Sequence, residues 1–478
     1  MARINRWCYV GVPAVSLAVI LLSLLNTPSW TGILPIEGDR WSSGPAADEP
    51  DRLYGQSDLN CKDFPHHRLA DIQVVLRLGS TQPLDQVLSH INNVTNCISN
   101  LIIVSDKEEQ LGDTPHRTHD IITDLPEVYW HDENPDLQAH GRINNPDSQN
   151  EPVTGRDGWL LDRFKFLPMV EYAFMQNERA KWFYFVEADT YIVWDTLFRL
   201  LDRYDARKEW YMGSPSPGRK MEDDKKTYFA YGGAGILLSR PAIEKLVHRE
   251  SSRTHGEFTE PSIAERWAQL VKDDCCGDSV LGFALANKGI FLSGLYPIFN
   301  PHPLHGIPFG PGAKMYWCQP VLSLHKTSPN DIPMLSGFLH RRPKDLPWLY
   351  ADVLDYLHIG DTMEKRQHWQ NSDWNGFDEE PESPVHKSVE ACAAGCHTHG
   401  ECYQWTYYSK ESWGEEPSEN KCTFVRSIRL GTPKEPETSP TTRLTWTSGW
   451  DTVRIKKWVN EMECADPEWV EPSIQRIY

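Results

Sequence analysis

A run of aromatic and β-branched residues, Trp182–Val186, constrains the fold of this chain more strongly than any other segment. Residues of this kind favour a central strand of a sheet. The run is followed at once by Glu187, Ala188 and Asp189. Open α/β sheets bind their ligands just beyond the carboxyl ends of strands. The pattern therefore predicts a buried strand that delivers an acidic pair to a binding site.

The segments around this run predict the rest of an α/β domain. Residues 72–78 and 100–104 are typical of strands, and residues 83–97 between them are typical of a helix. This strand-helix-strand order predicts an α/β sheet. Apolar residues at helical spacing also predict a helix over 159–174, which Pro168 should kink or end.

The N-terminus has the pattern of a membrane anchor. Residues 7–25 carry no charged side chain and are about long enough to span a bilayer. Arg3 and Arg6 precede this stretch, and acidic residues follow it. By the positive-inside rule we expect a cytoplasmic tail at 1–6 and a lumenal remainder. We expect a retained signal-anchor at 7–26, rather than a cleaved signal peptide, in a single-pass type II protein of the Golgi or ER membrane.

The cysteines fit a lumenal location. Of the eleven cysteines, Cys8 lies in the proposed anchor and the other ten can pair as disulfides in an oxidising compartment. Asn93-Val94-Thr95 also forms an N-glycosylation sequon.

Charge and composition divide the chain and exclude one class of partner. With 67 acidic and 48 basic residues, the net charge of −19 argues against nucleic acid as a binding partner.

The length of the chain allows two or three folded units. Composition predicts a stem at 27–70, an α/β domain at 71–358, a polar linker at 359–385 and a small cysteine-rich unit at 386–466.

Four segments carry a specific resemblance: WFYFVEADTYIVWDTLFRLL from residue 182, YMGSP from 211, YGGAGILLS from 231 and GDSVLGFAL from 277. In order and spacing they resemble the Fringe and core-1 β-1,3-galactosyltransferase branch of glycosyltransferase family 31. The resemblance covers about residues 71–345. It implies a GT-A fold, a manganese-dependent inverting transfer from a UDP-sugar donor, and a β-1,3 linkage to a glycan or glycoprotein acceptor.

The resemblance implies a metal site. Where the family usually has Asp-Asp-Asp-Thr-Tyr, Glu187 and Ala188 replace the first two aspartates, and Asp189 retains the metal-binding third. A divalent cation held by carboxylates can stabilise the charge on a departing diphosphate. WCQPVLSLH, ending at His325, resembles the late strand that ends in the family's metal-binding histidine. His302 and His305 are the alternatives to His325.

Asp278 is the candidate catalytic base. An inverting transfer needs a group that takes the proton of the acceptor hydroxyl, and a partly desolvated carboxylate can do so. Asp278 lies four residues before Gly282, as in the family's Asp-x-x-x-Gly motif, whereas Asp273 and Asp274 do not fit. The alternative is that Asp278 only caps the following helix.

Donor binding is expected at the strand ends and at a glycine-rich turn. Lys165 could meet the charge of the diphosphate, and Gly232 and Gly233 could allow close approach of the backbone to a substrate. The turn lacks the Lys-Ser/Thr ending of a P-loop. The full set of expected donor-binding residues is Arg77, Gly79, Asp106, Lys165, Glu187, Gly232 and Gly233.

The C-terminal cysteines resemble those of a PAN/Apple domain, a small α+β unit. They are Cys392, Cys396, Cys402 and Cys422. The lumenal topology favours disulfides over a zinc site with His397 and His399. Cys464 could pair within this unit or with another domain. By analogy, this unit could help to hold the acceptor.

Two other classes of function remain open at this point. One is a catalytically inactive, lectin-like membrane protein in which the altered Glu187-Ala188-Asp189 motif no longer supports transfer. The other is a secreted carbohydrate-binding protein, which requires cleavage after the apolar N-terminal run.

Overall fold

The computed structural model describes residues 61–130, 134–145, 152–250, 258–307, 309–311, 316–359, 363–414 and 417–475. The expected anchor at 7–26 and most of the expected stem lie outside these residues. Within the described ranges, no helix is both long and apolar enough to cross a bilayer.

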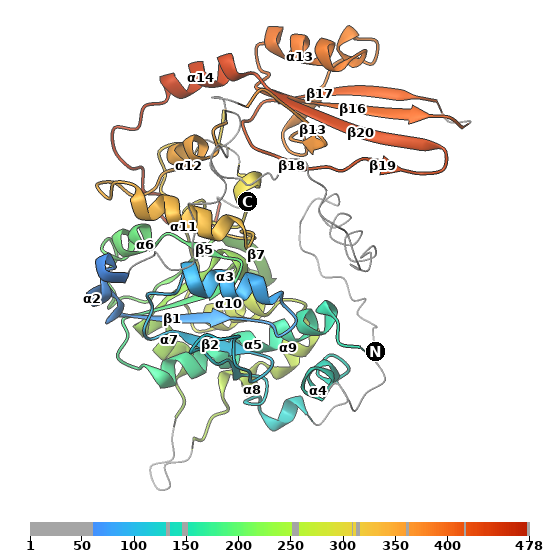
Figure 1. Cartoon of the computed structure of the whole chain (residues 1–478). Helices are drawn as coiled ribbons and strands as arrows, with labels where there is room; N and C mark the ends of the chain where they lie inside the picture. The colour runs from blue at the N-terminus through green and yellow to red at the C-terminus, as the bar shows by residue number, and fades with distance from the viewer. Residues whose placement is uncertain are drawn as a thin grey trace.

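A seven-stranded sheet forms the centre of the larger domain (Figure 1). The strand order is β10-β6-β9-β4-β1-β2-β3. β1 pairs in parallel with β2 and β4, whereas β9 runs antiparallel to β4 and β6. The mixed α/β architecture expected from the sequence is confirmed. The strands are β1 (Ile72–Arg77), β2 (Ile102–Ser105), β3 (His119–Asp120), β4 (Trp182–Glu187), β6 (Tyr211–Gly213), β9 (Ile236–Ser239) and β10 (Ser293–Gly294).

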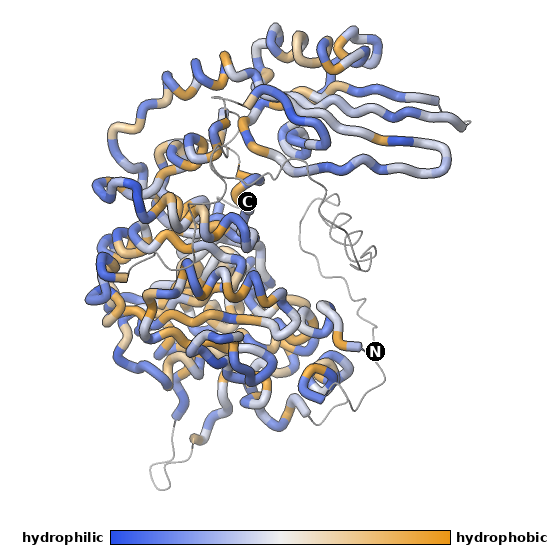
Figure 2. The backbone as a smooth tube through the Cα atoms, viewed as in Figure 1, coloured by the Kyte–Doolittle hydropathy of each residue, from blue (hydrophilic) through white to orange (hydrophobic). Residues whose placement is uncertain are grey.

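Both faces of the central strands are covered, which explains why their sequences are almost continuously apolar. All six residues of β1 are buried. Val74 and Leu76 join one apolar cluster and Val75 joins the other, because successive side chains point to opposite faces. α3 (Leu84–Asn93) contributes to the first cluster and α5 (Gly155–Gln176) to the second. Figure 2 shows the apolar strands lying inside these layers.

α5 begins earlier and runs further than the sequence predicted. Thr154 and Asp157 form a capping box that starts the helix at Gly155. The alternative that Pro168 ends the helix is wrong, because α5 continues to Gln176. Pro168 is buried within a helix that packs against α4, α7, α8 and α10, and this tertiary packing offsets the lost backbone hydrogen bond.

The remaining helices of the larger domain surround the sheet. They are α2 (His66–Leu69), α4 (Gln138–Asn144), α6 (Trp194–Leu201), α7 (Arg240–Val247), α8 (Ile263–Arg266), α9 (Ala268–Asp273), α10 (Gly277–Asn287), α11 (Asp331–Arg341) and α12 (Tyr350–Tyr356). A two-stranded ribbon of β7 (Pro215–Lys220) and β8 (Lys226–Ala230) packs against α10.

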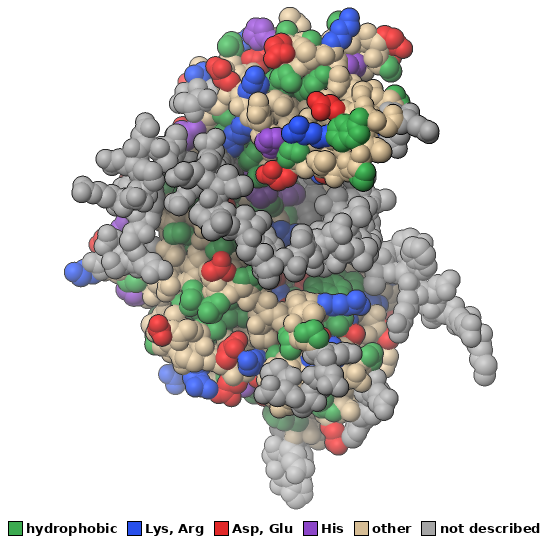
Figure 3. All heavy atoms as spheres, turned by 45° about the vertical axis from the view of Figure 1, so that its right-hand side comes forward, with side chains coloured by type: hydrophobic (Ala, Val, Ile, Leu, Met, Phe, Trp, Pro, Cys, Tyr) green, Lys and Arg blue, Asp and Glu red, His purple; other side chains and the backbone are tan. Residues whose placement is uncertain are grey.

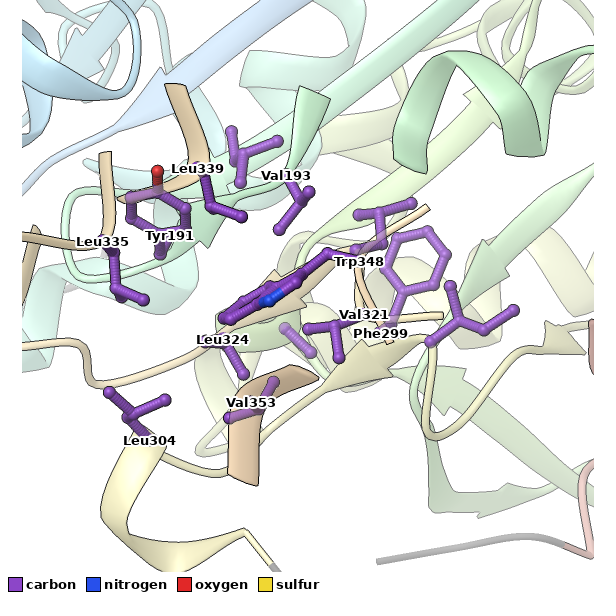
Figure 4. Close-up of a cluster of buried hydrophobic side chains, with 14 of the residues drawn as sticks. Tyr191, Val193, Phe299, Leu304, Val321, Leu324, Leu335, Leu339, Trp348 and Val353 are labelled. Carbon is purple, nitrogen blue, oxygen red and sulfur yellow. The ribbon is translucent and has the colours of Figure 1, made fainter. Parts of the chain in front are cut away.

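A second, three-stranded sheet lies beside the first and has the order β11-β12-β5. Its strands are β5 (Tyr191–Ile192), β11 (Phe299–Asn300) and β12 (Ser323–Leu324). Figure 4 shows that Trp348, which is fully buried, lies among apolar side chains that include Tyr191, Leu324 and Leu335. This packing supports the pairing of β5 with β12.

The C-terminal unit is built on an antiparallel sheet covered on one face by α13 (Val389–Thr398). Disulfide Cys392–Cys422 attaches α13 to the sheet, and Cys396–Cys402 attaches it to the turn that precedes the sheet strand starting at Gln404. These bonds use the cysteines that the zinc alternative required, so that alternative is wrong. The strands of this unit are β13 (Lys365–Gln367), β15 (Gly376–Asp378), β16 (Gln404–Ser412), β17 (Glu419–Val425), β19 (Glu437–Thr438) and β20 (Thr442–Trp450), with β14 (Trp369–Gln370) and β18 (Thr432–Pro433) paired separately.

Residues 359–385, expected to form a linker, are partly folded into the C-terminal unit. β13 pairs with β20, and β15 pairs with β17. Their side chains are mostly polar and partly exposed, so they gave no periodic apolar signal.

The two units are joined by a covalent bond as well as by packing. Cys318–Cys464 links the larger domain to the segment after α14 (Thr452–Glu461). Trp317 packs on Trp458 and donates a hydrogen bond to the carbonyl oxygen of Met462. Figure 3 shows one unit stacked above the other, with described side chains of both charge signs on the visible face.

Candidate active site

The carboxyl end of β4 presents two carboxylates next to a histidine. Glu187 ends β4, and a tight turn closed by the hydrogen bond from Thr190 N to Glu187 O (3.0 Å) presents Asp189. β5 follows directly and pairs with β12 in the register Leu324–Tyr191, which places His325 beside the turn. Nε2 of His325 lies 3.6 Å from Oδ2 of Asp189 and 3.9 Å from Oε2 of Glu187.

These three side chains fit a divalent cation. Their potential ligand atoms all lie within 4.8 Å of one another. Oδ1 of Asp189 is buried and has no hydrogen-bond partner among the described residues. Nδ1 of His325 lies 3.3 Å from the carbonyl oxygen of Pro301, so the tautomer that donates there leaves the Nε2 lone pair free for a metal. The two carboxylates are ligands that manganese prefers, and the imidazole is an acceptable although less preferred one.

Helix α3 holds the turn that carries Asp189. Nε2 of Gln86 donates a hydrogen bond to the carbonyl oxygen of Ala188 (3.0 Å). Nε2 of His90 lies 3.2 Å from the carbonyl oxygen of Thr190. The carbonyl between them, that of Asp189, accepts from the backbone N–H of Thr327 (2.9 Å). The sequence analysis missed Gln86 and His90. The feature that could have indicated them is two polar residues four positions apart on an amphipathic helix.

A turn at Gly232 and Gly233 connects the metal ligands to the candidate base. The backbone N–H of Gly232 donates to Oδ2 of Asp278 (2.8 Å). A Cβ atom on Gly233 would lie 2.3 Å from Nε2 of His325, so only glycine fits there without displacement. Gly233 therefore allows the close approach of the turn to His325, and an approach of this turn to a substrate stays a prediction.

Asp278 lies in the first turn of α10 but does not cap it. Cys276 occupies the cap position, and Oδ1 of Asp278 accepts from the N–H of the next residue, Ser279 (2.9 Å). Burial raises the pKa of Asp278 to about 6, although the bond from Gly232 and the charge of Arg77 oppose that rise. A carboxylate with this pKa can accept a proton near neutral pH.

The comparison with protein families matches this part of the chain. Residues 161–293 match the family model described as Fringe-like. The chain carries a Fringe-like domain. The matched residues include β4, the Asp189 turn, Gly232, Gly233 and Asp278.

Curated relatives are similar to the same region. Lunatic fringe of Danio rerio, named a β-1,3-N-acetylglucosaminyltransferase, is 33% identical over 140 residues, which cover 26% of this chain and 36% of that protein. Radical fringe of Gallus gallus is 37% identical over 144 residues, 28% of this chain and 36% of the relative. The Fringe glycosyltransferase of Drosophila melanogaster is 37% identical over 78 residues, 14% of this chain and 19% of the relative. The chain thus spans about a third or less of the length of each.

Arg77 lies between two acids at the edge of the candidate site. Its guanidinium contacts Asp162 and Glu187, and its Cζ lies 4.1 Å from the centre of the Phe166 ring. Burial raises the pKa of Glu187, while the charge of Arg77 opposes that rise. Arg77 therefore stabilises the carboxylate form of Glu187 beside the cluster.

Lys165 does not have the position that the sequence suggested. Its side chain is fully buried, and Nζ donates to Oδ2 of Asp106 (2.6 Å) and to the carbonyl oxygen of Leu78 (2.7 Å). An ammonium group with these two partners is not available to a diphosphate. Oδ1 of Asp106 accepts from Ser80 N (2.9 Å), so the Lys165–Asp106 pair supports the loop that contains Gly79.

The alternatives to His325 and Asp278 have other partners. Neither His302 nor His305 belongs to a potential metal-binding group among the described residues. Asp274 pairs with Arg219 at 2.7 Å, and Asp273 accepts from Gln269. Asp274 also forms a potential metal-binding group with Cys275 and Cys276, but its ion pair with Arg219 already balances its charge.

Proposed function

We propose that this protein is an inverting glycosyltransferase that moves a hexose or N-acetylhexosamine from a UDP-sugar to a glycan or glycoprotein acceptor, forming a β-1,3 linkage. One observation carries the proposal. The backbone turn at Gly232 and Gly233 holds a base of suitable pKa, Asp278, next to the cluster of Asp189 and His325. A candidate base and a candidate cation site thus lie on either side of one backbone turn, which supports the proposal.

In the proposed mechanism, Asp278 takes the proton of the acceptor hydroxyl as its oxygen attacks the anomeric carbon of the donor. The bond from that carbon to the UDP oxygen breaks on the opposite face, so the configuration inverts. Asp189 and His325 would hold Mn²⁺, which supplies positive charge to the departing diphosphate. The bonds from Gln86, His90 and Thr327 keep the Asp189 turn in place before substrate arrives.

Donor recognition is proposed for the residues at the strand ends. Glu187, held by Arg77, can accept hydrogen bonds from sugar hydroxyls. Gly79 and Asp106 border the loop after β1, where the nucleotide would lie by analogy with other open α/β sheets. The names of the relatives make UDP-N-acetylglucosamine the first donor to test.

The location and the role of the C-terminal unit are also proposals. The described residues contain four disulfides, which favours an oxidising compartment of the secretory pathway. We place the catalytic part in the lumen of the Golgi, held by the anchor at 7–26. The C-terminal unit, which resembles a PAN/Apple domain, would help to hold the acceptor.

The test is UDP release by the purified lumenal part with a panel of UDP-sugars, in Mn²⁺ and in chelator. We expect Mn²⁺-dependent release that Asp278→Asn lowers at least 100-fold. Asp273→Asn is the matched control, because Asp273 lies in the same segment and contacts Gln269. Sugar binding without any release would instead support the inactive, lectin-like alternative. Equal release by Asp278→Asn would overturn the assignment of the base.

A further inference from the structure

One large cavity in the described part of the chain lies away from the candidate active site. Its volume is about 480 Å³, and it is lined by parts of α3, β5, α6 and α11. Those helices lie side by side in Figure 1. No residue of the proposed metal site or base lines it. The cavity therefore needs an explanation other than donor binding.

Asn93, the acceptor of the glycosylation sequon, lines this cavity. It is the last residue of α3 and is half-buried. Its Nδ2 donates one hydrogen to the carbonyl oxygen of Ser89 (2.8 Å). A side-chain amide has two such hydrogens, and an N-linked sugar replaces one of them. The observed contact with Ser89 is thus compatible with a glycan on Asn93.

The cavity wall has the chemistry of a site for an amino sugar. Phe64, Trp194 and Phe198 form an aromatic cluster with ring centres 5.9 to 6.2 Å apart. Aromatic rings of this kind suit the apolar face of a pyranose. Arg342 also lines the cavity, and its buried Nε has no hydrogen-bond partner among the described residues. An acetamido carbonyl is an acceptor for such a donor.

We propose that Asn93 is N-glycosylated and that the first N-acetylglucosamine of its glycan occupies this cavity. The sugar comes from an oligosaccharide linked to a lipid diphosphate. Nδ2 bonds to C1 of the sugar and gives up one proton to the solvent, while the bond from C1 to the diphosphate oxygen breaks and the lipid diphosphate leaves with that bonding pair. The attachment precedes folding, because Thr95, which the transfer requires, is fully buried in the folded chain.

Thr95 allows a sharp test. Its Oγ1 is buried and has no hydrogen-bond partner within the described part of the chain. Thr95→Val keeps the shape of the side chain, removes that hydroxyl and destroys the sequon. Loss of an unpaired buried hydroxyl should not destabilise the fold. Any loss of stability in Thr95→Val then reports the missing sugar.

The experiment uses the full chain, made in a eukaryotic host that adds high-mannose glycans and then extracted from membranes. Peptide mass mapping should find a glycan on Asn93. Trimming with an endoglycosidase that leaves one N-acetylglucosamine should leave the melting temperature unchanged. Thr95→Val and Asn93→Gln should both melt about 3 °C or more below the wild type, while Thr95→Ser, which keeps the sequon, should retain the glycan.

Two results would overturn the proposal. One is an unmodified Asn93 in the folded chain. The other is a glycosylated wild type that melts at the same temperature as Thr95→Val, which would leave the sugar outside the cavity. If neither unglycosylated variant accumulates, the melting temperature of the wild type is compared before and after complete removal of the glycan. An unchanged melting temperature would also overturn the proposal.

Discussion

His325 and Asp189 face each other across the pairing of β12 with β5, with Nε2 and Oδ2 3.6 Å apart. The two strands are only two residues long each, so the buried cluster around Trp348 must hold the pairing in place. The geometry of the proposed metal site therefore depends on this packing as well as on the candidate ligands.

Gly233→Ala should abolish activity without unfolding the protein. The added Cβ would lie 2.3 Å from Nε2 of His325 and displace the imidazole. A displacement of about 1 Å at a reacting centre can cost about 100-fold in rate. We expect a loss of that size in kcat for UDP release. Gly155→Ala is the control, since a Cβ there has no neighbour within 4 Å, and unchanged activity is expected.

The pKa of Asp278, about 6, predicts the pH profile. As a base, Asp278 must be ionised, so kcat/KM should rise with pH through about 6 and then level off. The measurement is UDP release from pH 4.5 to 8 at saturating Mn²⁺. A profile that is flat through pH 6 would contradict the assignment of Asp278 as the base.

The same raised pKa predicts a gain in stability for Asp278→Asn. Folding favours the protonated form of Asp278. The contribution of that carboxyl group to the unfolding free energy is therefore fully present below its ordinary pKa near 4 and is lost as pH rises through about 6. Without metal, Asp278→Asn should exceed the wild type in unfolding free energy by about 3 kcal/mol at pH 7.5 and match it near pH 4. Denaturant unfolding at both pH values measures the difference in unfolding free energy. A difference that is the same at both pH values would contradict the raised pKa of Asp278.

Gln86 and His90 should affect metal affinity although neither touches the cation. Both support the carbonyls on either side of Asp189. Loss of such a support lowers metal affinity about 10- to 100-fold. We expect Gln86→Leu and His90→Phe to weaken Mn²⁺ binding by that factor. Gln110→Leu is the control, because Gln110 also donates to backbone carbonyls, those of Thr114 and His116, but on the surface.

The disulfides should differ in their contributions to stability. Cys318–Cys464 closes a sequence separation of 146 residues, and Cys396–Cys402 closes one of 6. Loop entropy predicts losses of about 5 and about 2 kcal/mol when each pair is changed to serine. Thermal unfolding of the two double variants compares them. A larger loss from the shorter loop would show that local packing, and not chain entropy, decides the effect.

The sequence predicted the central sheet because its strands are buried on both faces. β4 was expected at 182–186 and ends one residue later, and β1 was expected at 72–78 and ends one residue earlier. Pro168 was misjudged because local propensity ignores the helices that pack around α5. Local sequence also gave no indication that β13 and β15 belong to the C-terminal sheet.

The site was harder to predict than the sheet. Asp189, His325 and Asp278 were proposed from the resemblance to a known family, and the structure brings the first two together. Lys165 was misassigned, since a sequence does not show that Asp106 already neutralises its charge. Gln86 and His90 were missed because their partners are backbone carbonyls, which leave no trace in the sequence.

The most direct test of the central claim is a titration of the lumenal part with Mn²⁺ in the presence of UDP, with free Mn²⁺ measured by electron paramagnetic resonance. The account predicts one site on the wild type, lost or weakened at least 100-fold in both Asp189→Asn and His325→Ala. Binding that is equally tight in these variants, or no binding by the wild type, would contradict it.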